Sequence, residues 1–325
     1  MVLAAGLAVL LWFVTLPYYA LWPGPVDEVS DLVRVEGGPP LYELNGDVYM
    51  LTVSLQEVNA FGLAQGWIDP QVELVPRERI RPEGVTPEDH RKAGLRMMTD
   101  SKETAIAVAL DYVGIPVEYS GEGVLVVSVV EGTPAYGLLE VGDVIVEVGE
   151  TGVSVTDEGI EAIASNRIGD TISLTVQRAD RQIEIEVTLV EHTDNPGHPM
   201  VGFVPETYNR SLDLPFDIEI DSQGRGGPSA GVMYALALID LFTEEDLIAG
   251  NIVAGTGTIS ADGRVGAIGG VRQKVVAAQN AGALHVLVPE QNYADALAVK
   301  RDGVEIHAVS SIGDAIGILE QISAG

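Results

Sequence analysis

Residues 224–231 read GRGGPSAG and join two segments of different pattern. The preceding residues 214–221 alternate as in a strand, and the apolar residues 232–241 are typical of a helix. Three glycines and a proline precede Ser229, which predicts a tight turn with special backbone geometry. Ser229 therefore either caps the new helix or lies beside free N–H groups, such as that of Gly227, that could stabilise an oxyanion.

A second helix start follows at residues 269–278, which read GGVRQKVVAA. Val271, Lys274, Val275 and Ala278 share one helical face at spacings i, i+3, i+4 and i+7. An ammonium on an apolar face is costly, and loss of water lowers the pKa of an amine toward neutrality. A neutral amine could take the proton of a serine hydroxyl. The alternative is a lysine whose amine reaches out to solvent.

Together the two segments resemble the proteolytic domain of Lon peptidases, over about residues 214–325. The resemblance lies in PSAG around Ser229, in T-G-x-I-x-x-x-G-x-V-x-x-I-G-G at 256–270, and in the lysine four residues later. It implies that Ser229 is the nucleophile, that Lys274 is the general base and that Thr256 helps to hold the amine. Many members carry Asp three residues before the serine, where this chain has glycine.

Residues 115–192 differ in character, because short Val- and Ile-rich strands alternate there with glycine turns and a helical piece at about 156–165. GVLVVSVVEGTPA at 123–135 and GDVI at 142–145 resemble PDZ domains. The resemblance implies that an extended peptide adds as a strand and that a loop receives a free C-terminus. The candidate residues of this loop are Ser120, Gly121, Gly123 and Val124. The alternative is a small β-barrel that serves only as a spacer.

The N-terminal residues 2–22 are mostly apolar, and no charged residue occurs before Asp27. As a helix they would span about 30 Å, the thickness of the hydrocarbon core of a bilayer. We therefore expect a transmembrane anchor at residues 1–25, with Tyr18, Tyr19 and Trp22 at the interface. A cleaved signal peptide is the alternative. The expected location is the cell membrane, crossed once, with the soluble portion outside the cytoplasm.

Residues 26–114 predict a hairpin at 41–54 turned by Asn45-Gly46, an irregular connection at 74–95 and a helix at 96–113. These elements look like the beginning of the Lon proteolytic fold, which would place the PDZ domain as an insertion within it. The expected fold is α+β, with a transmembrane helix, a β-rich PDZ domain and a Lon-type α/β domain at 200–325. This combination resembles the YlbL-type membrane peptidases of bacteria.

Composition excludes several classes of site and partner. The formal net charge of −30, from 48 acidic and 18 basic residues, argues against binding to nucleic acid. The chain has no cysteine, which excludes disulfides and thiolate nucleophiles. Its five histidines do not fall at metal-ligand spacing, so we expect no metal and take all of them as structural or surface residues.

No phosphate-binding motif G-x-x-x-x-G-K-[ST] occurs in the sequence, and we expect no cofactor. The resemblances together imply an ATP-independent serine endopeptidase with a Ser–Lys dyad, tethered to the membrane. Its PDZ domain would recruit or gate polypeptides through their C-termini or exposed segments, and Lon-type domains commonly form homo-oligomers. The rival functions are a PDZ adaptor with little activity and a membrane-tethered chaperone.

Overall fold

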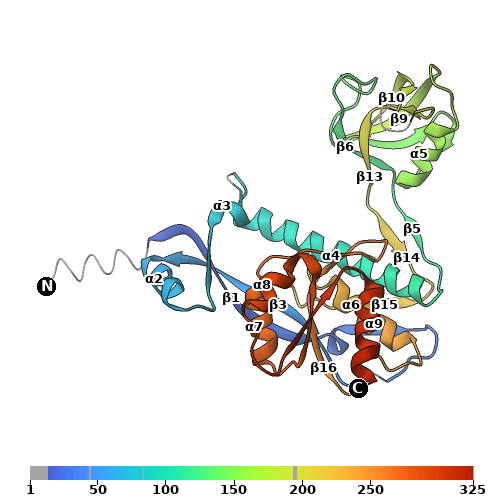
Figure 1. Ribbon diagram of the computed structural model, residues 1–325. Coiled ribbons are helices and arrows are strands. Elements are labelled where there is room, and N and C mark those ends of the chain that lie inside the picture. The colour runs from blue at the N-terminus through green and yellow to red at the C-terminus, as the bar shows by residue number, and fades with distance from the viewer. Residues whose placement is uncertain (1–13, 44, 83, 193–195, 325) are drawn as a thin grey trace, which may run out of the picture. The chain divides into compact units, whose positions relative to one another are not determined.

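The computed structural model describes residues 14–43, 45–82, 84–192 and 196–324, and these fold into two compact units. One unit holds the described residues of Met1–Pro116 and Pro215–Gly325, and the other holds those of Val117–Leu214. The chain thus leaves the first unit after Pro116 and returns to it at Pro215 (Figure 1). Both units combine helices and strands, so the mixed α and β content predicted from the sequence is confirmed.

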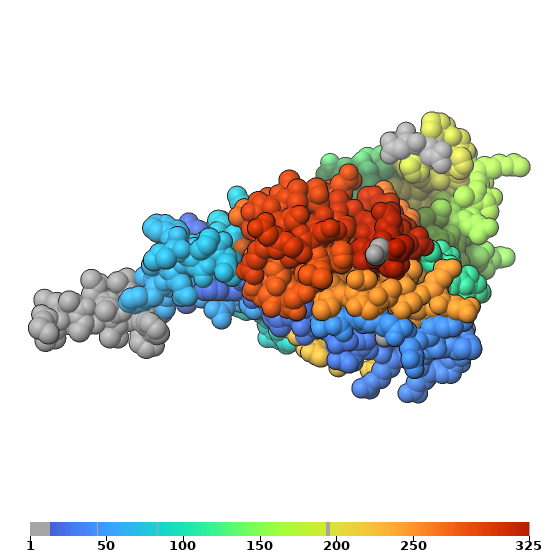
Figure 2. All heavy atoms as spheres, turned by 60° about the horizontal axis from the view of Figure 1, so that its bottom comes forward, coloured from blue at the N-terminus to red at the C-terminus, as the bar shows by residue number. Residues whose placement is uncertain are grey.

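The first unit is built on a six-stranded mixed sheet in the order β20-β19-β16-β3-β1-β4. Strand β16 is parallel to β3 and β19, whereas β1 is antiparallel to β3 and β4. Strand β3 from the first part of the chain thus pairs with β16 from its last third, and Figure 2 shows blue residues of the first part packed beside orange residues of the last third. The strands span Thr15–Glu28 (β1), Asp47–Asn59 (β3), Glu73–Pro76 (β4), Ile252–Gly255 (β16), His285–Pro289 (β19) and Glu305–Val309 (β20).

Helices cover both faces of this sheet. The apolar stripe predicted on α7 packs against Ala254, Val286 and Val288 of the sheet. Gly255 and Leu287 alternate with these residues, and the side chain of Met233 in α6 approaches Gly255 from the opposite face. The helices are α2 (Ala60–Ile68), α3 (Arg77–Ile80), α4 (Pro87–Tyr112), α6 (Gly231–Phe242), α7 (Val271–Asn280), α8 (Tyr293–Leu297) and α9 (Ile312–Ser323).

Short elements complete the first unit. Two ribbons pair β2 (Val33–Glu36) with β15 (Asp217–Ile220), and β17 (Thr258–Ile259) with β18 (Val265–Gly266). Helix α6 is buried along nearly its whole length because α4, α9 and β3 all contact it. The stretch ALALI within α6 is apolar on every side, which is typical of a helix that is buried all round.

The second unit is β-rich, and its described residues form one helix, α5 (Thr156–Ala164). Its sheet has the order β10-β9-β7-β6-β13, and its core comes from the inward residues of these strands. The buried carboxylate of Asp143 accepts hydrogen bonds from Arg178 at 2.7 and 2.8 Å, which fixes the Gly-Asp turn before β7. The strands are β6 (Val124–Val129), β7 (Val144–Val148), β8 (Thr151–Gly152), β9 (Thr171–Arg178), β10 (Arg181–Thr188) and β13 (Phe203–Thr207).

Two small ribbons also belong to the second unit. Strand β5 (Glu118–Ser120) pairs with β14 (Ser211–Asp213), and β11 (Val190–Glu191) pairs with β12 (Pro199–Met200). Strand β13 lies beyond residue 192, where the predicted β-rich segment ended. Pro205 interrupts its alternating pattern, and proline within such a run is typical of an edge strand, which β13 is.

The predicted helix over residues 2–22 is wrong for residues 15–22, which belong to β1. Strand β1 lies inside the sheet between β3 and β4, so it is apolar on both faces and looks like a membrane segment. A register shift between Pro23 and Val26 accommodates the prolines. Residues 1–13 of the predicted anchor lie outside the described residues. Across the described ranges, no helix has both the length and the apolar composition needed to cross a bilayer.

Two further predictions for the first unit are corrected. Residues 41–43 form no strand, so the hairpin at 41–54 is wrong, and β3 pairs with β1 instead. The connection at 74–95 is not irregular, because it contains β4, α3 and the first turns of α4. Thr86 caps α4 with its hydroxyl, which receives the N–H of Asp89. The helices predicted at 96–113 and 156–165 are confirmed as α4 and α5.

Candidate active site

Ser229 lies at the end of the glycine-rich turn, immediately before α6. The N-cap residue of α6 is Ala230, and no side chain caps the helix. Gly224 and Gly227 have φ values of 71° and 95°, which favour glycine and let the chain turn sharply from β15 toward α6. The hydroxyl of Ser229 is therefore not used for capping, and it is half-buried and available for other contacts.

Helix α4 supports the turn from behind. The N–H of Gly227 donates to the carbonyl of Gly94 at 2.8 Å, and the hydroxyl of Ser101 donates to the carbonyl of Pro228 at 3.0 Å. A Cβ at Gly226 would lie 3.0 Å from the carbonyl carbon of Gly94, so glycine fits this position better than a larger residue. Because its N–H is already bonded, Gly227 does not supply the free oxyanion donor that the sequence suggested.

Lys274 points from the first turn of α7 directly at Ser229. Its Nζ lies 2.7 Å from Ser229 Oγ and 2.9 Å from Thr256 Oγ1. The lysine is 3% exposed, so the alternative in which its amine reaches out to solvent is wrong. Gly270, in the left-handed conformation with φ of 66°, begins the helix that places it. The structure thus brings together the three residues Ser229, Thr256 and Lys274.

Thr256 holds this arrangement from the end of β16. It is fully buried, and its N–H donates to the carbonyl of Leu287 on the neighbouring strand at 3.1 Å. Its hydroxyl accepts from Lys274 and donates to the carbonyl of Ser229 at 3.0 Å. The Thr256 hydroxyl therefore links the Lys274 amine to the backbone carbonyl of Ser229.

Burial changes the acid–base behaviour of this pair. Removal of the Lys274 amine from water lowers its pKa from 10.5 to about 7. A substantial fraction of the amine is then neutral near pH 7, which an exposed lysine is not. A neutral amine within hydrogen-bonding distance of a hydroxyl can accept its proton, and the alkoxide that forms is a nucleophile.

The pair opens into a cleft of about 580 Å³. The N–H groups of Ser229 and Ala230 at the start of α6 have no hydrogen-bond partner among the described residues. One wall is the part of β3 beyond Met50, where β16 has ended and no other described strand pairs with this edge. The other lining residues are Pro25, Met98, Arg225, Gly226, Gly227, Pro228, Thr258, Ala267, Ile268, Gly269 and Lys274.

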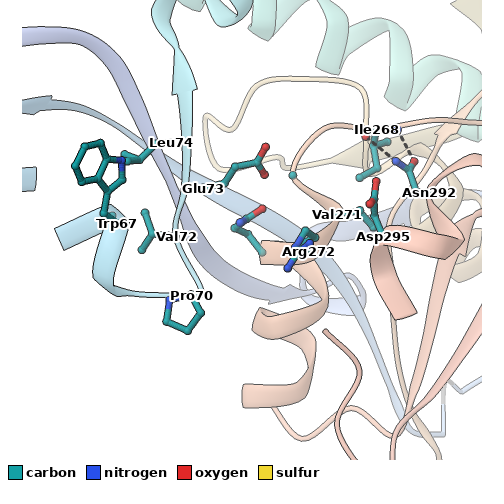
Figure 3. A pocket seen from close by; sticks show the side chains of 13 residues that line it. Trp67, Pro70, Val72, Glu73, Leu74, Ile268, Val271, Arg272, Asn292 and Asp295 are labelled. Atoms are coloured by element: carbon teal, nitrogen blue, oxygen red, sulfur yellow. Dashed lines mark hydrogen bonds between the residues drawn. The ribbon is translucent and has the colours of Figure 1, made fainter. Parts of the chain in front are cut away.

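A second hollow of about 640 Å³ adjoins this cleft at Ile268, which lines both. In Figure 3, residues of α2 and β4 such as Trp67 and Leu74 lie on one side, and Arg272 and Asp295 lie on the other. The side chain of Asn292 accepts from the N–H of Ile268 at 2.8 Å and donates to its carbonyl at 3.1 Å. These bonds fix the loop that leads into α7 and hence position Lys274.

In the predicted peptide-binding loop of the second unit, two backbone N–H groups are already hydrogen-bonded. Ser120 belongs to β5 and its hydroxyl lies 2.8 Å from that of Ser211. The N–H groups at 122 and 123 donate to the carbonyls of Tyr208 and Ser154. Added side chains at Gly121 and Gly123 would collide with neighbouring residues. Val124 begins β6, an inner strand between β7 and β13, so this segment is not a free edge.

Comparisons with known proteins match one segment of the sequence that falls mainly in each unit. Residues 211–321 match the C-terminal proteolytic domain of Lon protease (S16), and residues 111–189 match the PDZ domain. Lon protease 1 of Herpetosiphon aurantiacus is 36% identical over 116 residues, which cover 35% of this chain and 14% of that protein. Lon protease of Clostridioides difficile is 33% identical over 183 residues, which cover 54% of this chain and 21% of that protein.

The match to these relatives is thus confined to a small part of their length. Among solved structures, the PDZ domain of the SdrC-like protein from Listeria innocua is 31% identical. The matched region covers 26% of this chain and 92% of the Listeria innocua chain, with a TM-score of 0.24. From the two domain matches, the chain contains a PDZ domain at residues 111–189 and, at residues 211–321, a C-terminal proteolytic domain of the Lon protease (S16) family.

Proposed function

We propose that this chain is a serine endopeptidase that cleaves polypeptides with a Ser229–Lys274 dyad. The observation that carries the proposal is the 2.7 Å contact between Ser229 Oγ and the buried amine of Lys274. The match to the Lon protease (S16) proteolytic domain supports the same reaction class. Because the sequence contains no phosphate-binding motif of the P-loop type, we propose that this chain cleaves without hydrolysing ATP itself.

The mechanism follows from the positions of the three side chains. The neutral amine of Lys274 accepts the proton of Ser229 as Oγ attacks the peptide carbonyl, and the resulting ammonium protonates the leaving amine. An acyl-enzyme remains on Ser229, and the same amine then activates the water that hydrolyses it. Thr256 keeps the amine oriented through both steps. The unpartnered N–H groups of Ser229 and Ala230 would stabilise the oxyanion.

The walls of the cleft favour an extended substrate. Beyond Met50, β3 is paired on one side by β1 and has no strand on its other side among the described residues. A polypeptide could add to this edge as a strand and present its backbone carbonyl to Ser229. Such binding uses main-chain hydrogen bonds, so it predicts cleavage within flexible or unfolded segments rather than within folded domains.

The PDZ domain would recruit or gate these substrates. We propose that the peptide adds to β13, because β13 is an edge strand and α5 lies beside it. Thr207 at the end of β13 is joined to Thr156 at the start of α5 by hydrogen bonds of 3.0 Å. Attachment to the membrane and assembly into homo-oligomers stay predictions, and β1 removes residues 15–22 from the segment on which the membrane prediction rests.

The experiment that tests the peptidase is cleavage of an unfolded protein without nucleotide. The full chain is incubated with the substrate in EDTA, and mass spectrometry identifies the products and any covalent adduct of a serine-directed phosphonate. We expect cleavage and modification of Ser229 alone. If the chain binds peptides but neither cleaves them nor reacts, the rival function as a PDZ adaptor or chaperone replaces the proposal.

The activity is expected to depend on pH in the way that the Lys274 amine titrates. Because burial lowers the pKa of Lys274 to about 7, kcat/KM should rise as the pH increases through about 7 and then level off. Initial rates on a fluorogenic peptide, measured from about pH 5.5 to about pH 9, report this profile. A rate that falls over this range, or that rises only near the pKa of an ordinary lysine, would contradict a buried lysine base.

Peptide binding to the PDZ domain should protect β13 rather than the loop at 120–124. The measurement is amide hydrogen exchange of the Ser229→Ala protein with and without a bound peptide, since this variant cannot consume the peptide. We expect slower exchange in β13 and α5, because a paired edge strand exchanges its amides more slowly. Protection confined to 120–124 would restore the loop that the sequence suggested.

A further inference from the structure

Three potential metal ligands lie close together on β19 and β20, at one edge of the sheet of the first unit. Strands β19 and β20 are parallel neighbours, with His285 opposite Glu305 and Leu287 opposite His307. Successive residues of a strand point to opposite faces, so Glu305 and His307 share a face, and register brings His285 onto the same face. Among the described residues, this is the one group of three His, Cys, Asp or Glu side chains whose ligand atoms lie this close together.

The distances within this group approach those around a bound metal ion. His285 Nδ1 lies 3.2 Å from His307 Nε2. Glu305 Oε2 lies 3.7 Å from the first nitrogen and 3.8 Å from the second. Ligand atoms about 2.0–2.1 Å from a tetrahedral Zn²⁺ are about 3.3 Å from one another. The three atoms thus already outline one face of such a tetrahedron.

Small movements would complete the geometry. The side chain of Glu305 is 66% exposed, so its carboxylate can shift by the few tenths of an ångström that separate the observed distances from the ideal ones. The two imidazoles are 17% and 20% exposed and are held on paired strands, so they are already oriented. The two partly buried imidazoles thus supply the nitrogens, and the exposed carboxylate supplies the oxygen.

From this geometry we propose that His285, Glu305 and His307 bind one zinc ion. Two imidazole nitrogens and one carboxylate oxygen suit Zn²⁺, whereas Mg²⁺ and Ca²⁺ prefer oxygen ligands throughout. Three protein ligands leave a fourth position for water, which the exposure of Glu305 allows. The ion would join the edge strand β20 to its neighbour β19.

The proposed site shares no residue with the cleft of Ser229 and Lys274. His285 is the first residue of β19, whereas the contact with Thr256 involves the carbonyl of Leu287 farther along the strand. We therefore expect zinc to stabilise the first unit without taking part in peptide cleavage. The proposal also revises the expectation that these histidines are only structural or surface residues.

Calorimetry on the full chain tests the site. The protein is stripped with EDTA, dialysed and titrated with ZnCl₂, and a parallel titration uses MgCl₂. We expect one equivalent of Zn²⁺ to bind, with an increase in the thermal midpoint, because a ligand that binds only the folded state stabilises it. We expect no saturable binding of Mg²⁺. Absence of a saturable one-equivalent event with zinc would overturn the proposal.

Variants identify the ligands. His285→Gln, Glu305→Gln and His307→Gln should each weaken zinc binding by more than about 100-fold, since loss of a partner outside the ligand set alone costs about 10- to 100-fold. His198→Gln, at an exposed histidine of the other unit, is the matched control and should bind as the wild type does. If the three ligand variants all bound zinc with the affinity of the wild type, the zinc would bind at another place in the chain.

A spectroscopic measurement on the unaltered protein removes the risk that a variant misfolds. Titration with CoCl₂ should produce intense visible absorption of a tetrahedral Co²⁺ site, and one equivalent of Zn²⁺ should abolish it. A weak octahedral spectrum that zinc does not change would contradict the proposed ligand geometry.

Discussion

The Ser229→Ala protein is expected to lose peptide cleavage almost completely while it keeps its fold. Removal of the nucleophile of a serine peptidase lowers kcat by roughly 10⁴-fold or more, and the remaining rate reflects the oxyanion site and substrate binding. The substitution deletes one hydroxyl that is half-buried and caps no helix, so the free energy of unfolding should change little. Cleavage of a fluorogenic peptide and the circular dichroism spectrum measure the two effects.

Ser128→Ala is the matched control, because Ser128 is an exposed serine in β6 of the other unit. Its rate should equal that of the wild type. Retention of a tenth of the wild-type rate after Ser229→Ala would mean that another residue attacks the peptide. A loss of activity accompanied by unfolding would instead leave the nucleophile to be assigned by covalent labelling.

The Lys274→Met protein should be both inactive and more stable than the wild type. Loss of the general base lowers the rate by roughly 10²- to 10⁴-fold. Methionine has a similar length and carries no charge, so it removes the cost of a desolvated amine. The pKa of Lys274 falls from 10.5 to about 7. At about 1.4 kcal/mol per pKa unit the desolvation cost is about 5 kcal/mol. Loss of the two hydrogen bonds of the amine offsets part of it, so the variant should be stabilised by about 2–4 kcal/mol at pH 7.

The stability that Lys274→Met gains over the wild type should decrease as the pH rises. Between about pH 7 and 10.5 the unfolded chain holds a proton that the folded chain has released, so the stability of the wild type rises with pH in this window. The advantage of Lys274→Met is therefore largest below pH 7 and disappears above about 10.5. Lys300→Met, at an exposed lysine, should show no such gain.

Tryptophan fluorescence during urea unfolding isolates the relevant unit, because all three tryptophans lie before Pro116. A Lys274→Met protein that is less stable at pH 7 would argue that hydrogen bonds outweigh desolvation at this amine. A variant that remains active would exclude Lys274 as the base. The two measurements are independent, so either can fail alone.

The residues that form the candidate site were predictable from the sequence because each lies at a local boundary. The glycine turn before Ser229 and the apolar stripe around Lys274 are short-range patterns, and short-range patterns determine where helices begin. The contact between the two could be inferred only from a resemblance. Nothing local relates two helix starts that are 45 residues apart.

The predictions that were wrong concern features that depend on tertiary contacts. Residues 15–22 look like a membrane segment because an inner strand is apolar on both faces, although Pro17 and Pro23 already disfavoured a long helix. The N–H of Gly227 was predicted to be free, but it donates a hydrogen bond to the carbonyl of Gly94 in α4, far away in the sequence. The metal-ligand candidates escaped notice because His285 and His307 come from separate strands, whereas motif spacing reveals ligands within one element.

The ribbon of β5 and β14 has a consequence for the history of the chain. Glu118 lies opposite Asp213 and Ser120 lies opposite Ser211, so the two ends of the PDZ-containing unit run side by side. A module whose ends are adjacent can be gained, exchanged or lost in a single genetic event, because a short join restores the continuity of the host. The same catalytic scaffold could thus acquire a different recognition module over evolution while its own strands and helices stay unchanged.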